Sequence, residues 1–299
     1  MSEDKEILLE KVRELEKMKF HDDLTSENTA KILNEEQRLS PPMPEAKARR
    51  IMSGKSRRGF LVGAAAALTG IFGWRWMSDE TKQALLRRTF EFNEKVAQVF
   101  YRPSRLSPEF PPERISQPPR VNGFAGLSEG FDPATWTLSV GGLANRTDDL
   151  VLTLDQIKAL PRTEMTTELK CVEGWSIIVN WAGVRFSDFA SVYLPKTIDG
   201  SLPDIVNHAE NLVPYVSLVT PDQAYYVGWD MPSILHPQTL LAYEINGQPL
   251  PLEHGAPLRL ASPTKYGIKL IKRIGRIEFT AARPKDYWAE QGYDWYSGH

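Results

Sequence analysis

Apolar and polar positions divide the 299-residue chain into a charged beginning, a short uncharged stretch and a long part with many brief apolar runs. In residues 1–38, apolar residues recur at spacings of three and four among many charges, which is typical of a short amphipathic helix. Prolines between residues 41 and 44 end that pattern and predict a linker. Residues 79–101 repeat the helical spacing, so we expect a second amphipathic helix or stalk, ended by Pro103. Residues 103–119, rich in proline, predict an extended arm.

Residues 120–299 show the short alternating runs that predict β-strands. A short helix is expected within 152–161, entered by Thr153 or Asp155 as N-cap. Asn246-Gly247 predicts a tight turn. The expected strands lie at 136–142, 166–172, 177–179, 215–219, 240–245, 258–260 and 274–279. The pattern predicts a mixed, β-rich α+β domain with its elements in one layer system.

Composition removes several classes of function. The net charge is −2, so there is no overall basic excess and no nucleic-acid partner is expected. The sequence has one cysteine, which excludes a framework of internal disulfides, a cysteine-rich zinc site and a c-type haem attachment motif. The five histidines are not clustered at ligand spacing. A metal held by several protein ligands is therefore not expected.

A basic block precedes the uncharged stretch. Residues 47–58 carry six positive charges and no acid, and residues 59–74 carry no charge at all. This order is typical of an export signal, although a buried helix with basic flanks would also produce it. The run Ser56-Arg57-Arg58-Gly59-Phe60-Leu61 resembles the twin-arginine motif, which implies export of the folded protein across the bacterial cytoplasmic membrane by the twin-arginine translocase.

The residues that follow the signal favour an anchor. No Ala-x-Ala cleavage site follows residue 74, and the aromatic residues Trp74 and Trp76 suit a membrane interface. We therefore expect an uncleaved signal anchor, with residues 1–55 in the cytoplasm and the bulk of the chain on the periplasmic side. The expected segments are a charged extension at 1–55, the signal or signal anchor at 56–78, a stalk and arm at 79–119 and the main domain at 120–299.

The single cysteine, Cys171, lies in the run Glu168-Leu169-Lys170-Cys171-Val172-Glu173-Gly174-Trp175. A lone cysteine is most often a small buried hydrophobic residue. Three kinds of chemistry are possible for it: a nucleophile, which needs a nearby base, a redox thiol, which needs an outside partner, and a soft metal ligand. One thiolate holds a metal only when an organic cofactor supplies the other ligands.

Four cations fall within fourteen residues near the C-terminus: Arg259, Lys265, Lys269 and Lys272. Arginine and lysine side chains bind phosphate groups, and Gly267 between them would let the backbone approach a ligand closely. The alternative is a solvated basic strand edge, which discourages edge-to-edge association.

Together these segments resemble a known family. Cys171-Val172-Glu173-Gly174-Trp175-Ser176 resembles the molybdenum-ligand loop of the sulfite oxidase fold, found in molybdopterin-dependent oxidoreductases. Residues 241–251 with 254–260 resemble the second signature of that family, and residues 263–272 resemble its pterin phosphate loop. The resemblance covers about residues 115–299 and implies a sulfite oxidase-type molybdopterin-binding domain that holds Mo-molybdopterin.

The resemblance also implies a role for individual residues. Cys171 would be the catalytic thiolate ligand to molybdenum. The positions that match cofactor contacts are Asn122, Trp175, Thr220, His254, Arg259, Gly267, Lys269 and Lys272.

The implied activity is oxygen-atom transfer at molybdenum. We expect neither a haem domain nor a dimerisation domain, so the architecture is closer to bacterial methionine sulfoxide reductase catalytic subunits, which work with a membrane haem protein. The leading hypothesis is reduction of a small-molecule or protein-bound S- or N-oxide, with electrons from a membrane cytochrome b and a monomeric catalytic domain. The alternatives are a sulfite dehydrogenase and a non-catalytic, membrane-tethered binding protein. Arg146, Arg162 and Arg185 match no anion-binding motif of the sulfite oxidases.

Overall fold

The computed structural model of the protein describes residues 77–102, 104–123 and 125–298. Every helix and strand given below belongs to the compact unit Ser78–His299. The expected cytoplasmic extension, twin-arginine motif and anchor lie outside the described residues. No helix in the described ranges combines the length and the apolar character needed to cross a membrane.

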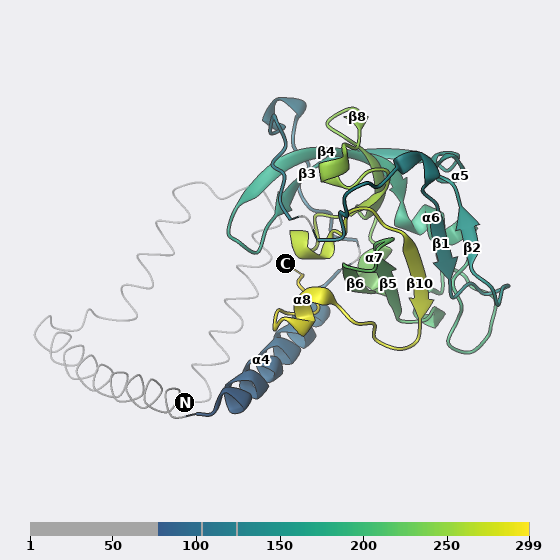
Figure 1. Cartoon of the computed structure of the whole chain (residues 1–299). Coiled ribbons are helices and arrows are strands. Elements are labelled where there is room, and N and C mark those ends of the chain that lie inside the picture. The colour runs from purple at the N-terminus through teal and green to yellow at the C-terminus, as the bar shows by residue number, and fades with distance from the viewer. Residues whose placement is uncertain (1–76, 103, 124, 299) are drawn as a thin grey trace, which may run out of the picture. The chain divides into compact units, whose positions relative to one another are not determined.

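The longest helix among the described residues is α4, Asp79–Phe100, as the spacing of its apolar residues predicts (Figure 1). The side chain of Ser78 accepts a hydrogen bond from the Thr81 amide and so caps the first turn, whose two acids suit the positive end of the helix dipole. Near its other end, Glu94 is buried and forms an ion pair with Arg283 at 2.6 Å. This contact attaches α4 to the domain.

The first sheet has five strands in the order β2-β1-β10-β5-β6. Its neighbours are antiparallel except for β1 and β10, which run parallel. The strands are β1 Leu138–Gly141, β2 Leu150–Leu152, β5 Tyr215–Val219, β6 Tyr226–Asp230 and β10 Arg276–Thr280.

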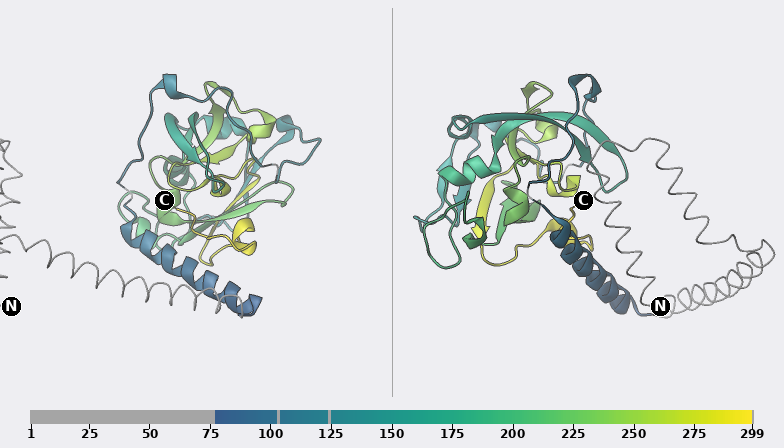
Figure 2. Two further views of the ribbon diagram at one scale, coloured as in Figure 1. Left: turned by 90° about the vertical axis from the view of Figure 1, so that its left-hand side faces the viewer. Right: turned by 180° about the vertical axis from the view of Figure 1, so that it is seen from behind.

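The second sheet is antiparallel, in the order β3-β4-β7-β8, with β9 also paired to β7. Figure 2 shows β3 and β4 as a long curved ribbon. The strands are β3 Arg162–Lys170, β4 Ser176–Arg185, β7 Leu240–Ile245, β8 Gln248–Pro249 and β9 Arg259–Ala261. Strand β4 is bulged between Ala182 and Gly183. A Cβ atom at Gly183 would lie 2.1 Å from the Leu241 carbonyl oxygen, so only glycine allows β7 to approach there.

Short helices connect the strands. In α5 (Leu154–Lys158), Thr153 and Gln156 form a capping box, which agrees with the expected N-cap. The other α-helices are α6 Phe186–Val192, α7 Met231–Ile234 and α8 Tyr287–Glu290. The 3₁₀ turns are η1 Pro112–Arg114, η2 Pro133–Thr135, η3 Ala209–Asn211, η4 Leu252–His254 and η5 Gly267–Lys269.

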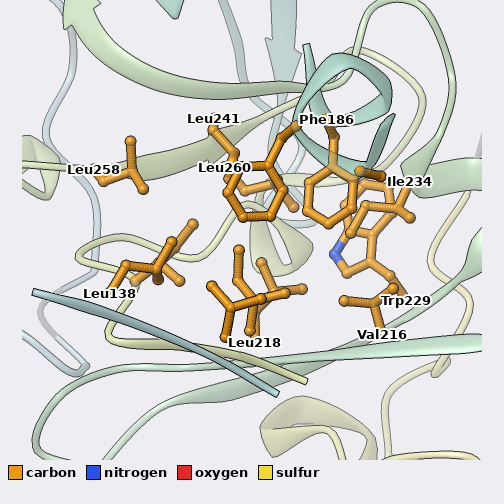
Figure 3. Close-up of a cluster of buried hydrophobic side chains, with 14 of the residues drawn as sticks. Leu138, Phe186, Val216, Leu218, Trp229, Ile234, Leu241, Leu258 and Leu260 are labelled. Carbon is orange, nitrogen blue, oxygen red and sulfur yellow. The ribbon is translucent and has the colours of Figure 1, made fainter. Parts of the chain in front are cut away.

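The main hydrophobic core lies between the two sheets. Figure 3 shows Leu138 and Leu218 of the first sheet meeting Leu241 and Leu260 of the second, with Phe186 of α6 beside them. Burial of this apolar surface is the principal force that holds the two sheets together.

A second, smaller core covers the opposite face of the second sheet. In β7, Leu241 and Tyr243 belong to the main core, whereas Leu240 and Ala242 belong to the second, as the alternation of side chains along a strand requires. The second sheet is therefore apolar on both faces, and the second face is available to line a pocket.

The expected β-rich α+β fold is confirmed. The domain is built on two sheets that share a core. Strands β3 and β4 are longer than predicted, and β2, β6 and α6 were not predicted. Strand β6 is buried along most of its length, so it lacks the polar alternation that reveals a half-exposed strand.

Candidate functional site

The β3–β4 hairpin positions Cys171. The strands pair as far as Lys170 and Ser176, so residues 171–175 form the loop. The Cys171 amide donates to the Trp175 carbonyl oxygen at 2.9 Å, and the Gly174 amide donates to the Cys171 carbonyl oxygen at 3.1 Å. Gly174 has a φ of 85°, in the left-handed region that glycine adopts without strain. These contacts fix the loop and the direction of the thiol.

The thiol is buried but not isolated. Cys171 is 8% exposed, and the Asn122 side-chain amide donates to its sulfur at 3.6 Å. Burial raises the pKa of the Cys171 thiol, and the nearby charge of Arg120 offsets only part of this effect. The protein alone therefore does not maintain a reactive thiolate. A bound metal ion would, because metal coordination deprotonates a thiol.

A pocket of about 1080 Å³, counted with its open mouth, adjoins Cys171. Its apolar floor comes from the second sheet, where alternate residues of β4 (Ile177, Val179 and Trp181) point to one face together with Ile245 of β7. The strand pleat explains this arrangement, since residues two apart share a face.

Residues 254–272 form another wall and contribute His254, Arg259 and Lys272. Gly255, between the first two, has a φ of 98°, and a Cβ atom there would lie 2.6 Å from the Lys272 Cβ. Only glycine allows the two segments to approach so closely. The shape of this wall therefore requires glycine at position 255 as well as the cations that line it.

Neither Arg259 nor Lys272 forms an ion pair with a carboxylate of the described chain, although the more distant Glu253 carboxylate offsets part of the Lys272 charge. The buried Arg259 guanidinium donates to the carbonyl oxygens of His254 (3.0 Å) and Leu270 (3.3 Å) and stacks on the Trp181 ring at 4.6 Å. Half-buried Lys272 donates to three carbonyl oxygens, those of Asn122, Gly123 and Glu253, at 2.7 to 2.9 Å.

Burial lowers the pKa of Lys272 to about 7, assisted by the positive charge of Arg259, and burial lowers the pKa of Arg259 to about 10. An anion placed in the pocket would remove this penalty by stabilising both charges.

His254 is held neutral between these cations. Burial lowers its pKa to about 4, and the positive charges of Arg259 and Lys272 act in the same direction. At neutral pH its imidazole can therefore both donate and accept a hydrogen bond, which suits the polar edge of a heterocyclic ring.

Aromatic side chains also line the pocket. The Arg120 guanidinium stacks on Trp175 at 4.4 Å, and the Trp175 indole donates to the Glu173 carboxylate at 2.9 Å. Trp288 and Tyr293 line the pocket as well, and their rings meet edge to face at 5.2 Å.

The structure brings most of the predicted site residues together. Those that line the pocket are Asn122, Cys171, Trp175, His254, Arg259, Gly267 and Lys272. Thr220 and Lys269 do not line it. Thr220 is buried in a turn, where its hydroxyl donates to Asp222 at 2.6 Å.

Lys269 is fully buried and forms an ion pair with Asp286 at 2.5 Å. Lys265 is buried in the same way and pairs with Asp230 at 3.1 Å. Because Arg259 is buried too, the alternative of a solvated basic strand edge is wrong. The four cations have two separate surroundings, two with internal partners and two at the pocket.

Several pocket residues were not predicted as site residues: Arg120, Glu173, Trp181, Tyr225, Trp288 and Tyr293. The alternation along β4 could have placed Trp181 beside Ile177 and Val179. No local pattern marks Trp288 or Tyr293, because only the folded chain brings them to the hairpin.

The donor set fits Mo-molybdopterin. The thiol suits a soft metal, and the two cations without an ion pair suit a phosphate. Within residues 77–298, as far as the structure describes them, no group of three or more His, Cys, Asp or Glu side chains could hold a metal ion. A metal at Cys171 would therefore need ligands supplied by an organic cofactor.

Comparison with known proteins agrees with this reading of the pocket. Residues 125–288 match the family model of the oxidoreductase molybdopterin binding domain. A protein of Azospira oryzae, provisionally named protein-methionine-sulfoxide reductase subunit YedZ1, is 34% identical over 250 residues, which cover 81% of this chain and 88% of that protein.

The protein-methionine-sulfoxide reductase catalytic subunit MsrP of Xanthomonas axonopodis pv. citri is 34% identical over 153 residues, which are 51% of this chain and 47% of that protein. The match thus spans about half the length of that relative. Among solved structures, the sulfane dehydrogenase SoxCD from Paracoccus pantotrophus aligns with a TM-score of 0.43 and 19% identity, over 51% of this chain and 40% of that chain.

Proposed function

The chain belongs to the family of oxidoreductase molybdopterin-binding domains, and from that premise we propose that it reduces an S-oxide at a molybdenum centre ligated by Cys171. The protein is thus an enzyme whose cofactor is Mo-molybdopterin. When bound, this cofactor supplies oxygen-atom transfer and two-electron redox chemistry, while the protein binds and orients the reactants.

One observation carries the proposal: a single pocket joins the thiol to two cations that have no carboxylate partner. Cys171 would hold the metal from the hairpin side. Arg259 and Lys272 would hold the phosphate of the cofactor from the wall formed by residues 254–272, and neutral His254 would orient the heterocycle. Asn122, which donates to the sulfur, would fix the direction of the thiolate lone pairs.

The aromatic part of the pocket lining supports a neutral S-oxide as the substrate. Trp175, Trp288 and Tyr293 offer apolar surface to a thioether group. The negative charge of Glu173 balances the positive charge of Arg120, so the lining does not require an anionic ligand there. Two similar proteins are named as methionine sulfoxide reductase subunits, so we take methionine sulfoxide, free or within a protein, as the substrate. The positive charge of Arg120 would instead favour the sulfite anion, so a sulfite dehydrogenase is the alternative function.

The electrons would come from another protein. We take the donor to be a membrane haem protein, as expected for methionine sulfoxide reductase catalytic subunits. The twin-arginine motif at residues 56–61 would place the domain on the periplasmic side, because a cofactor inserted in the cytoplasm must be exported within a folded protein.

The test uses full-length protein produced in a host that makes the cofactor. We expect molybdenum in the purified protein and reduction of methionine sulfoxide by dye electron carriers, with little oxidation of sulfite. Cys171→Ser should abolish turnover while the fold persists, as judged by circular dichroism. Wild-type protein without molybdenum, or undiminished turnover by the variant, would contradict the metal site. Faster turnover of sulfite than of sulfoxide would favour the alternative.

A further inference from the structure

Helix α4 carries an apolar stripe that the domain does not cover. Leu85, Phe92, Val96 and Val99 are all exposed, and Phe92 and Val99 are 65% and 76% exposed. At 100° per residue they fall within an arc of about 60°. The side of α4 that contacts the domain is marked by Glu94, buried against Arg283, and lies roughly opposite this arc.

The charged residues of α4 are distributed unevenly around the helix. Arg88 and Lys95 border it directly, and neither forms an ion pair within the described part of the chain. The other half of the helix carries the acids Asp79, Glu80, Glu91 and Glu94, together with one cation, Arg87. An apolar stripe bordered by cations and turned away from acids is the pattern of a helix that lies in a membrane interface.

A second copy of the chain fits this stripe less well. Leu85, Phe92 and Val99 recur at every seventh residue, as one position of a coiled-coil seam would. The accompanying seam positions are Arg88 and Lys95 in one register and Thr89 and Val96 in the other. In the first register the two cations would be buried in the seam, and in the second they would flank it opposite Leu86, Asn93 and Phe100 of a parallel partner, without an acid in either case. At a lipid surface long basic side chains reach the headgroups.

The sequence before α4 also points to lipid. The helix begins five residues after Trp74, the end of the uncharged run that starts at Gly59. If that run enters a membrane, the stripe starts close to the membrane surface, and its local concentration there is high enough for a weak apolar contact to form.

We propose that α4 lies on an anionic lipid surface through Leu85, Phe92, Val96 and Val99, with Arg88 and Lys95 at the headgroups. The helix then serves as a second membrane contact that limits how the attached domain can turn. This inference does not depend on the reaction that the pocket catalyses.

The test places single fluorescent labels on the full-length chain in a Cys171→Ala background. Phe92→Cys and Val99→Cys report on the stripe, and Glu91→Cys is the matched control on the acidic half. Each protein is reconstituted in vesicles of phosphatidylethanolamine and phosphatidylglycerol. We expect nitroxide-bearing lipids to quench the two stripe labels and aqueous iodide to quench the control.

A charge test accompanies it. Arg88→Glu with Lys95→Glu should reduce lipid quenching of the Phe92 label in vesicles with phosphatidylglycerol and have little effect in phosphatidylcholine. Iodide quenching of all labels alike would overturn the proposal. Protection of the stripe from iodide without nitroxide quenching would mean that a protein covers it, and would overturn the proposal as well.

Discussion

At the scale of single residues, two lysines three positions apart have different surroundings. Lys269 donates to the Asp286 carboxylate and to the Trp295 carbonyl oxygen inside the protein. Lys272 reaches only carbonyl oxygens at the edge of the pocket. Sequence spacing could not separate them, because Asp286 lies seventeen residues away from Lys269 and a charge pattern does not show which cation finds an internal partner.

The two lysines should therefore respond differently to the same substitution. Lys269→Met leaves Asp286 buried and unpaired, and should lower the free energy of unfolding by about 3–5 kcal/mol. Lys272→Met should lower the molybdenum content per folded molecule, with a smaller loss of stability. Denaturant titration and metal analysis of both variants check this. Normal molybdenum content in Lys272→Met would exclude a phosphate-binding role for that lysine.

His254 makes stability depend on pH. Its pKa is lowered from 6.5 to about 4 in the folded protein, so the unfolded chain binds more protons between these values. Neutral His254 contributes up to about 3 kcal/mol to the free energy of unfolding. This contribution is fully present above pH 6.5 and is lost as the pH falls towards 4. His254→Gln should flatten the pH dependence of the unfolding free energy in this window. An unchanged slope would show that His254 is not held neutral.

At the scale of elements, the spacing of apolar residues predicted the helices and strands whose conformation depends on residues close together in the chain. Helix α4 and strands β5 and β7 lie where their periodicity places them. The pairing of the strands does not follow from such patterns. Strands β1 and β10 are parallel neighbours although well over a hundred residues separate them, and only the shared core brings them together.

The arm that precedes the pocket residues, 104–119, is held in place by contacts with residues far away in the sequence. Gln238 donates to the Ser107 carbonyl oxygen at 3.0 Å and accepts from the Ser107 amide at 2.8 Å. Further on, the Ser116 amide donates to the Ile178 carbonyl oxygen at 2.9 Å. These bonds fix the approach of the segment that brings Asn122 to Cys171.

Releasing the arm should therefore be measurable. Gln238→Leu leaves both polar groups of Ser107 without this partner, at a cost of about 1–3 kcal/mol. Hydrogen exchange should speed up in a peptide that covers residues 104–110. Gln156→Leu, which breaks a capping box elsewhere, is the control and should leave that peptide protected. Equal exchange in both variants would show that Gln238 does not hold the arm.

At the scale of the whole molecule, the pocket is assembled from parts that are far apart in sequence. The hairpin supplies Cys171 and the 254–272 wall supplies the cations. The C-terminal segment supplies Trp288 and Tyr293. That last segment is attached to the first sheet and to η5, since Asp286 accepts from the Gly228 amide of β6 and pairs with Lys269. No single stretch of sequence could have shown this wall.

If that wall receives the substrate, its removal should weaken binding without altering the metal site. Trp288→Ala should raise KM for a peptide containing methionine sulfoxide about tenfold, equivalent to ~1.4 kcal/mol, and leave kcat nearly unchanged. Trp288→Phe, which retains an aromatic surface, should recover most of this loss. Molybdenum content should be equal in all three proteins, because Cys171, Arg259 and Lys272, and not Trp288, would hold the cofactor. A fall in kcat with unchanged KM would instead assign Trp288 to the chemical step.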